Sequence, residues 1–204
     1  MLNVGDSVPT WADLVNRHEA SHDLFVSCSI EYSFRVRDDA EETGTFAVWH
    51  GPQDRWRVEV AEQPVYVRTG DVAFALKKGT MQRQEPTARQ FKVLQPVNPL
   101  SFFGPSSLLS RSGVLAPSVS AIAAEVGGRR GWSFVADQLT LGARNTLEDR
   151  LEFVIDDKTG LALRIGSVNG RLSGELRTVQ VFEWLPDSLF EWSDEEAGLN
   201  GLDD

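Results

Sequence analysis

The chemistry that the sequence suggests most directly is zinc binding, because two histidines and a glutamate have the spacing of a metal-binding helix. Residues 18–22 read HEASH, which matches the pattern H-E-x-x-H. On a helix, His18 and His22 share a face and can bind Zn²⁺, with Glu19 as the general base. Zinc-binding helices of this kind are usually apolar, whereas Arg17 and Asp23 are charged, and no third ligand stands out. We therefore expect no metal, no cofactor and no catalysis; zinc metallohydrolase activity through His18 and His22 stays open as an alternative.

The same two histidines also fit the apolar face of an N-terminal helix. Thr10 and Asp13 have the spacing of a capping box, which predicts a helix over residues 11–22. The apolar face of this helix carries, at helical spacing, Trp11, Leu14, Val15, His18, His22 and Phe25. The histidines are then either hydrogen-bonded core residues or groups at the edge of a cavity.

Most of the remaining chain alternates between apolar and polar residues, as strands with one buried face do. The pattern is clearest at 27–37 and recurs at 45–50, 55–60 and 72–76, where Val72, Phe74 and Leu76 are expected to face the core. Further strands are expected at 118–126, which could instead be a helix, and at 132–139, 147–156, 161–165 and 171–184. Large sheets curl because strands twist. The predicted fold class is α+β, mainly β: about ten antiparallel strands in a strongly curved sheet, an unclosed β-barrel with the N-terminal helix on its concave face.

The stretch from residue 84 to 104 breaks the alternation. Pro86, Pro96 and Pro99 interrupt it, and Phe102 and Phe103 keep its end apolar. A long irregular segment inside a compact domain is often a lid. Residues 105–112 are expected to form a short helix, so we expect a helical lid on the concave face.

Composition bounds the possible functions. The chain has 204 residues and a net charge of −10, with seven acidic and no basic residues in 187–204. This balance argues against nucleic acid as a partner. The single cysteine excludes an internal disulfide, and neither a signal peptide nor an apolar run that could span a membrane is evident. We expect a cytoplasmic protein with one domain over residues 1–192 and a disordered acidic tail over residues 193–204.

Three short motifs resemble those of the LolA-like superfamily, which includes bacterial lipoprotein carriers, LppX-type lipid-binding lipoproteins and RseB-type sensors. They are residues 54–59 (DRWRVE) followed by Thr69-Gly70-Asp71, residues 104–109 (GPSSLL), and residues 155–164 (IDDKTGLALR). The resemblance covers about residues 10–192. It implies an unclosed β-barrel with helices over its mouth, which binds acyl chains or lipid-linked ligands in an apolar cavity without catalysis.

The main functional prediction is a carrier or sensor that holds a hydrophobic small molecule or a lipid acyl chain between the first helix and the sheet. A regulatory interaction module with a filled core, which binds a protein and no ligand, is the alternative. The side chains expected to line the ligand are Trp11, His18, His22, Tyr32, Phe34, Trp56, Val58, Phe74, Phe102 and Phe103.

Overall fold

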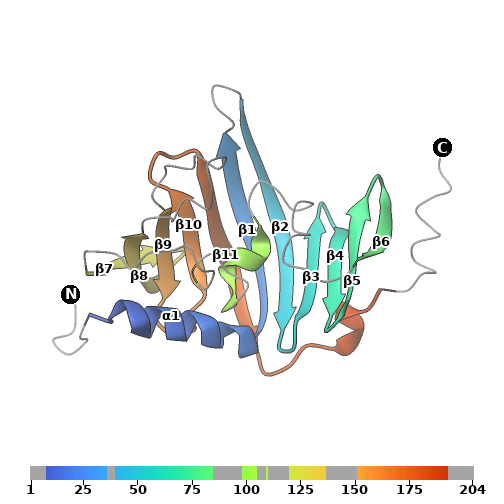
Figure 1. The fold of residues 1–204 in the computed structure, drawn as a ribbon, viewed down its shortest axis with the longest axis horizontal. Coiled ribbons are helices and arrows are strands. Elements are labelled where there is room, and N and C mark those ends of the chain that lie inside the picture. The colour runs from blue at the N-terminus through green and yellow to red at the C-terminus, as the bar shows by residue number, and fades with distance from the viewer. Residues whose placement is uncertain are drawn as a thin grey trace.

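The computed structural model describes residues 8–35, 40–84, 98–104, 109, 120–136 and 151–192. These residues form one antiparallel sheet of eleven strands with one α-helix lying along it (Figure 1). The strands are β1 Phe25–Arg35, β2 Glu41–Gly51, β3 Arg55–Val60, β4 Gln63–Thr69, β5 Val72–Lys77, β6 Thr80–Gln84, β7 Ile122–Val126, β8 Arg129–Ala136, β9 Leu151–Asp156, β10 Ala162–Ser167 and β11 Leu172–Phe182.

The centre of the sheet is β1, which pairs with both β2 and β11. The order across the sheet is β6-β5-β4-β3-β2-β1-β11-β10-β9-β8-β7 (Figure 1). The chain therefore builds one half outward from β1 to the edge strand β6. It then starts again at the opposite edge, β7, and returns to β11 beside β1. The strands β6 and β7 are opposite edges and do not pair with each other. The predicted unclosed, mainly β architecture is therefore confirmed, with one strand more than expected. The stretch that could have been a helix is β7.

The first helix is shorter than predicted. The α-helix α1 spans Trp11–Ala20 and begins with the predicted capping box, in which Thr10 and Asp13 exchange hydrogen bonds. A 3-10 turn, η1 (Ser21–Asp23), then leads into β1. The prediction of one helix through residue 22 was wrong, because the chain must tighten here to turn into the sheet, and Ser21 Oγ bonds back to the carbonyl of His18 at 2.6 Å.

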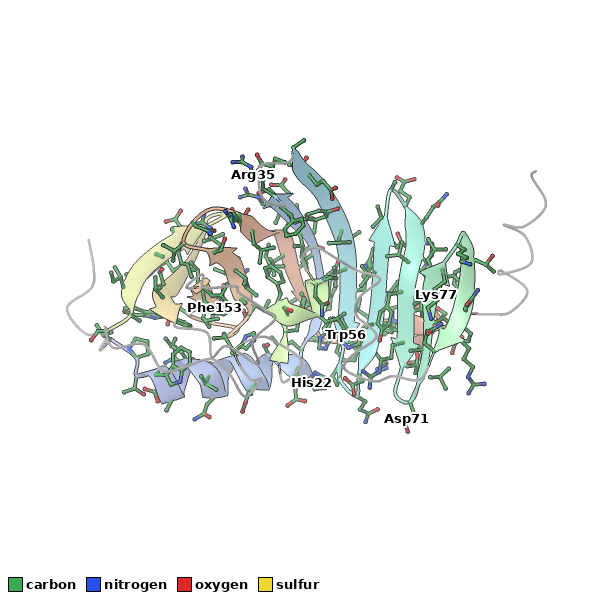
Figure 2. The ribbon with its side chains drawn as sticks, turned by 45° about the horizontal axis from the view of Figure 1, so that its top comes forward. His22, Arg35, Trp56, Asp71, Lys77 and Phe153 are labelled. Atoms are coloured by element: carbon green, nitrogen blue, oxygen red, sulfur yellow. The ribbon has the colours of Figure 1, made fainter. Side chains whose placement is uncertain are left out.

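One face of the sheet, here called the inner face, carries most of the buried side chains. On β1 to β3 it presents Val26, Cys28, Ile30, Phe46, Val48, His50, Trp56 and Val58. Figure 2 shows the sheet arched over α1, whose Leu14 joins the same core. On β4 the inner-face residues are Arg68 and Tyr66, which pair with Trp56 and Val58 of β3. On β5 they are Ala73 and Ala75, which pair with Arg68 and Tyr66.

The predicted orientation of β5 was therefore wrong. Phe74 pairs with Val67 and faces the outer side, whereas Ala73 and Ala75 are buried on the inner face. The outer face here is covered by a C-terminal 3-10 turn, η5 (Asp187–Phe190). Phe74 and Phe190 line a depression of about 170 Å³ on that side. Phe74 therefore shares an apolar site with Phe190 on the outer face, and does not face the core as predicted.

The apolar insert ends in a third 3-10 turn, η3 (Pro99–Phe102), whose first residue is proline after the capping residue Asn98. Leu100, Phe102 and the following Phe103 have no exposed surface. In Figure 1 the segment lies in front of the central strands. The predicted helix at 105–112 lies almost wholly outside the described residues, as does the predicted acidic tail. Within the described part of the chain, no helix is long and apolar enough to cross a membrane.

Candidate functional site

Four rings from four separate segments meet where η1 reaches the sheet: His22, His50, Trp56 and Phe103, here called the ring cluster. His22 comes from η1, His50 from β2, Trp56 from β3 and Phe103 from the end of the insert. The β2–β3 register sets His50 directly opposite Trp56, with ring centroids 4.2 Å apart. Phe103 stacks on His50 at 5.1 Å and meets Trp56 edge-on at 5.2 Å. His22 lies 5.3 Å from His50 (Figure 2 labels His22 and Trp56).

Three buried nitrogens of the ring cluster have no hydrogen-bond partner among the residues that the structure describes. They are His22 Nδ1, His50 Nε2 and Trp56 Nε1. Leaving a buried polar group unpaired costs about 1–3 kcal/mol, so such groups in native proteins usually bind water or a ligand. The ring cluster is therefore apolar in bulk and able to hydrogen-bond a guest.

The hydrogen bond of His50 assigns its tautomer. Nδ1 lies 3.0 Å from the carbonyl oxygen of Leu24, which can only accept, so Nδ1 carries the hydrogen. Burial, with help from the neighbouring His22 and Arg55, lowers the pKa of His50 from 6.5 to about 3. The ring is thus neutral near neutral pH, and its Nε2 is a lone-pair acceptor.

The solvent side of the ring cluster is charged. Asp54 accepts from Arg68 at 2.7 Å, and its other oxygen lies 3.9 Å from His22 Nε2. Arg68 also donates to the carbonyl of Gly70 at 2.8 Å. The β3–β4 motif of the sequence, Asp54 to Thr69-Gly70, therefore builds the polar rim beside the rings.

The other candidate histidine, His18, fastens α1 to the sheet. Its Nδ1 donates to the carbonyl of Gly160 at 2.8 Å, and burial lowers its pKa from 6.5 to about 4. Gly160 belongs to the β9–β10 turn, which Asp156 organises by accepting from the backbone of Lys158 and Thr159. Near the start of the helix, Trp11 packs edge-on against Phe134 at 4.8 Å.

The structure divides the predicted lining residues into groups. His22, Trp56 and Phe103 meet in the ring cluster, and Val58 and Phe102 are buried on the same inner face. Tyr32 and Phe34 are half-buried farther along β1, where Tyr32 stacks on Phe46 at 4.9 Å. The remaining three are placed elsewhere: Trp11 and His18 along α1, and Phe74 on the outer face.

The zinc pattern does not form a zinc-site geometry here. His18 and His22 lie on different helical segments, because α1 ends at Ala20. His18 is fully buried with Nδ1 bonded to a carbonyl, whereas Glu19 is exposed. Among the described residues no group of three or more His, Cys, Asp or Glu could hold a metal ion.

Sequence reasoning missed His50 as a functional candidate. The signal was present, because Phe46, Val48 and His50 alternate within a predicted strand and so share its buried face. A histidine on the buried face of a strand is a polar group in the core, and it is a candidate binding residue on the same grounds as the two histidines of the helix.

No protein-family model matches the sequence, and no curated protein matches it. Solved structures do resemble the fold. A complex of MucA and MucB from Pseudomonas aeruginosa matches with 18% identity and a TM-score of 0.52, over 91% of this chain and 62% of that chain. A structure of MucB matches with 19% identity and a TM-score of 0.52, over 90% and 63%.

The chain thus spans less than two thirds of the length of the MucB structures. A LolA superfamily protein from Nitrosomonas europaea, NE2245, matches over 92% of this chain and 99% of that chain, but with 11% identity and a TM-score of only 0.44. Identities this low bear on the fold alone. The two MucB matches support the predicted fold: the chain has an unclosed, mainly β fold like that of the MucB structures.

Proposed function

We propose that this protein binds a hydrophobic ligand without catalysis, and that the ligand's alkyl chain occupies the place now filled by the end of the insert. One observation carries the proposal. The middle of the inner face is filled by Leu100, Phe102 and Phe103, which come from a segment outside the sheet. The apolar surface beneath them belongs to the sheet and is available to any apolar guest that displaces them.

The energetics favour exchange between insert and ligand. Residues 98–104 form a single 3-10 turn and contribute no strand to the sheet, so side-chain burial dominates their attachment. Burial of a few hundred Å² of alkyl chain yields several kcal/mol at ~25 cal/mol per Å². The ligand must offset the lost burial of the insert as well as the cost of association. Affinity therefore depends on the difference between the two, and weakening the insert should strengthen binding.

The test is a comparison of Phe103→Ala with Phe134→Ala. Both remove a buried phenyl ring, but Phe134 lies on β8 against Trp11, at the other end of α1. Both variants should lose stability, by about 3–5 kcal/mol for a buried phenylalanine. Only Phe103→Ala should bind a pyrene-labelled dodecyl chain more tightly, because only that ring competes with the ligand.

The proposal fails if the native protein shows no saturable binding of the pyrene-labelled chain and Phe103→Ala shows none either. It also fails if Phe103→Ala binds more weakly than the native protein while Phe134→Ala does not. The milder pair Phe103→Leu and Phe134→Leu serves the same comparison if either alanine variant does not fold.

A separate observation favours protein binding as a second candidate function. At the end of β11, Val181, Phe182 and Trp184 are exposed by 45%, 38% and 67%. Val181 and Phe182 point to opposite faces of the strand, so Phe182 and Trp184 are the candidates for a shared apolar surface, and such exposed surface can mark a protein contact. If so, Trp184→Ser should abolish cross-linking to a protein partner in cells and leave binding of the pyrene-labelled chain unchanged.

The cytoplasmic location and the lack of catalysis remain predictions. Fractionation of cells that express the native gene would check the location. Assays of the purified protein for zinc content and peptidase activity would check the other.

A further inference from the structure

We propose that the ring cluster is a binding site for a hydroxyl group, so that the ligand is a neutral amphiphile with a hydroxyl head and an alkyl chain. This inference rests on the proposed function, because the alkyl chain takes the place of Leu100 and Phe102. It goes further by naming the chemical class of the head group and the atoms that hold it.

The hydrogen-bonding pattern of the ring cluster selects a hydroxyl. Trp56 Nε1 can only donate, and it is buried without a partner in the described part of the chain. His50 Nε2 is equally buried and unpaired, and it can only accept, because the hydrogen sits on the Nδ1 that faces Leu24. A hydroxyl group supplies both functions at one oxygen: it donates its hydrogen to His50 and accepts from Trp56. The centroids of the two rings are 4.2 Å apart, so the unpaired donor and the unpaired acceptor belong to neighbouring, directly contacting side chains.

His22, whose ring centroid lies 5.3 Å from that of His50, adds a third unpaired nitrogen. Its Nδ1 is buried and unpaired among the described residues, and its Nε2 is 3.9 Å from Asp54, too far to fix the tautomer by a hydrogen bond. His22 can therefore accept from or donate to a second polar atom of the head group. A head with more than one hydroxyl fits this arrangement.

The insert covers this site directly. Phe103 stacks on His50 and meets Trp56 at a right angle, so its ring contacts both side chains that hold the hydroxyl in this proposal. The backbone of Gly104 next to it donates to Ser21 Oγ at 3.1 Å, which ties the end of the insert to η1. Displacement of Phe103 thus opens the hydrogen-bonding groups and the apolar surface together.

The same atoms disfavour a carboxylate head. An ionised carboxylate has only acceptor oxygens, so it cannot donate to His50 Nε2. The ring does not gain a second proton near neutral pH, since burial keeps its pKa low. An ether also lacks the hydrogen that His50 needs, although it can accept from Trp56.

The experiment is competition against the pyrene-labelled dodecyl chain by dodecanol, methyl dodecyl ether and dodecanoate, at about pH 7.5. The three competitors share one alkyl chain and differ in the head. Dodecanol should compete about tenfold or more better than the ether, because sites built to bond a hydroxyl reject analogues that lack it. Dodecanoate should be the weakest.

Three variants locate the effect. Trp56→Phe and His50→Leu should each bring dodecanol down to the affinity of the ether while the probe still binds. His18→Leu is the matched control: it removes another buried histidine, which lies outside the ring cluster. Its Nδ1 also bonds a carbonyl, and its Nε2 also has no partner among the described residues. It should leave the preference for dodecanol intact. If His50→Leu does not fold, Trp56→Phe alone decides.

The outcomes separate this inference from the proposed function. Binding of the probe with equal competition by dodecanol and the ether means that the three nitrogens hold water only, and overturns the inference while the function stands. A preference for dodecanol that persists in Trp56→Phe overturns it too. Absence of probe binding in the native protein and in Phe103→Ala removes the proposed function, and the inference with it.

Discussion

At the scale of single residues, Gly160 is required both by its backbone conformation in the turn and by the close approach of α1. Its φ is +72°, and a β-carbon added there would lie 2.1 Å from the carbonyl oxygen of Arg17. Its own carbonyl accepts from His18. The turn between β9 and β10 therefore touches the backbone of α1 directly, and only glycine permits the contact. The close approach of the helix backbone, together with the positive φ, is the physical reason for a glycine after Thr159 in that turn.

We expect Gly160→Ala to be clearly more destabilising than Gly170→Ala. Gly170 has nearly the same φ, +73°, but no atom within 4 Å of the added β-carbon. Substitution at Gly170 should cost only the left-handed backbone penalty, about 1–2 kcal/mol. Gly160→Ala should cost several kcal/mol more, because α1 must move away. Urea denaturation of both variants measures the difference, and equal costs would show that the helix yields without penalty.

At the scale of elements, the chain after β11 packs on the outer face of the sheet, where η5 contacts β3 and β4. Phe190 is almost fully buried, and its carbonyl accepts from Thr69 Oγ1 at 2.6 Å. Arg55 bonds Asp187 at 2.6 Å while its guanidinium lies 5.9 Å from the Phe190 ring. The turn η5 is therefore a structural part of the half-barrel beside β3 and β4.

Two truncations should separate this turn from the acidic tail. A chain that ends at Trp192 should keep the thermal midpoint of the full protein, because the tail is too polar to offset its ordering entropy by burial. A chain that ends at Pro186 should lose about 1.5–3 kcal/mol for Phe190 alone, which lowers the midpoint by roughly 3–12 °C in a domain of this size. A large drop in the first truncation would show instead that the tail is docked.

The same turn explains why β5 was misread from the sequence. Alternation locates a strand and separates its two faces, and it did so for β1, β3 and β5. It identifies the buried face only where the other face is wet. Here η5 covers the outer face with Phe190, so the larger Phe74 faces outward and the small Ala73 and Ala75 face inward. A four-residue 3-10 turn has too weak a pattern to be predicted.

At the scale of the whole molecule, local patterns predicted the sheet and the family resemblance, but not the site. The ring cluster joins His22, His50, Trp56 and Phe103, whose proximity depends on the pairing register and on the path of the insert. Periodicity carries no information on how a segment between strands returns to the sheet. The sequence therefore predicted three of these four rings as ligand contacts without predicting that they touch.

The whole fold also depends on two histidines that stay neutral where α1 and η1 meet the sheet. Both are fully buried: His18 bonds the turn between β9 and β10, and His50 bonds the chain entering β1. Burial lowers their pKa values from 6.5 to about 4 and about 3. In the unfolded chain both rings take up protons near pH 6.5. Below that pH, protonation therefore favours the unfolded state.

We expect the free energy of unfolding to be highest above pH 6.5 and to fall as the pH drops toward the pKa values of the folded state. The loss is about 1.4 kcal/mol per histidine for each pH unit below 6.5, so roughly 2 kcal/mol per histidine by about pH 5. Urea denaturation across this range, above the titration of most carboxylates, measures it. His18→Leu and His50→Leu should each remove about half of the slope. If the double variant keeps the slope of the native protein, other groups govern the acid sensitivity, and the two buried histidines do not make the fold sensitive to acid.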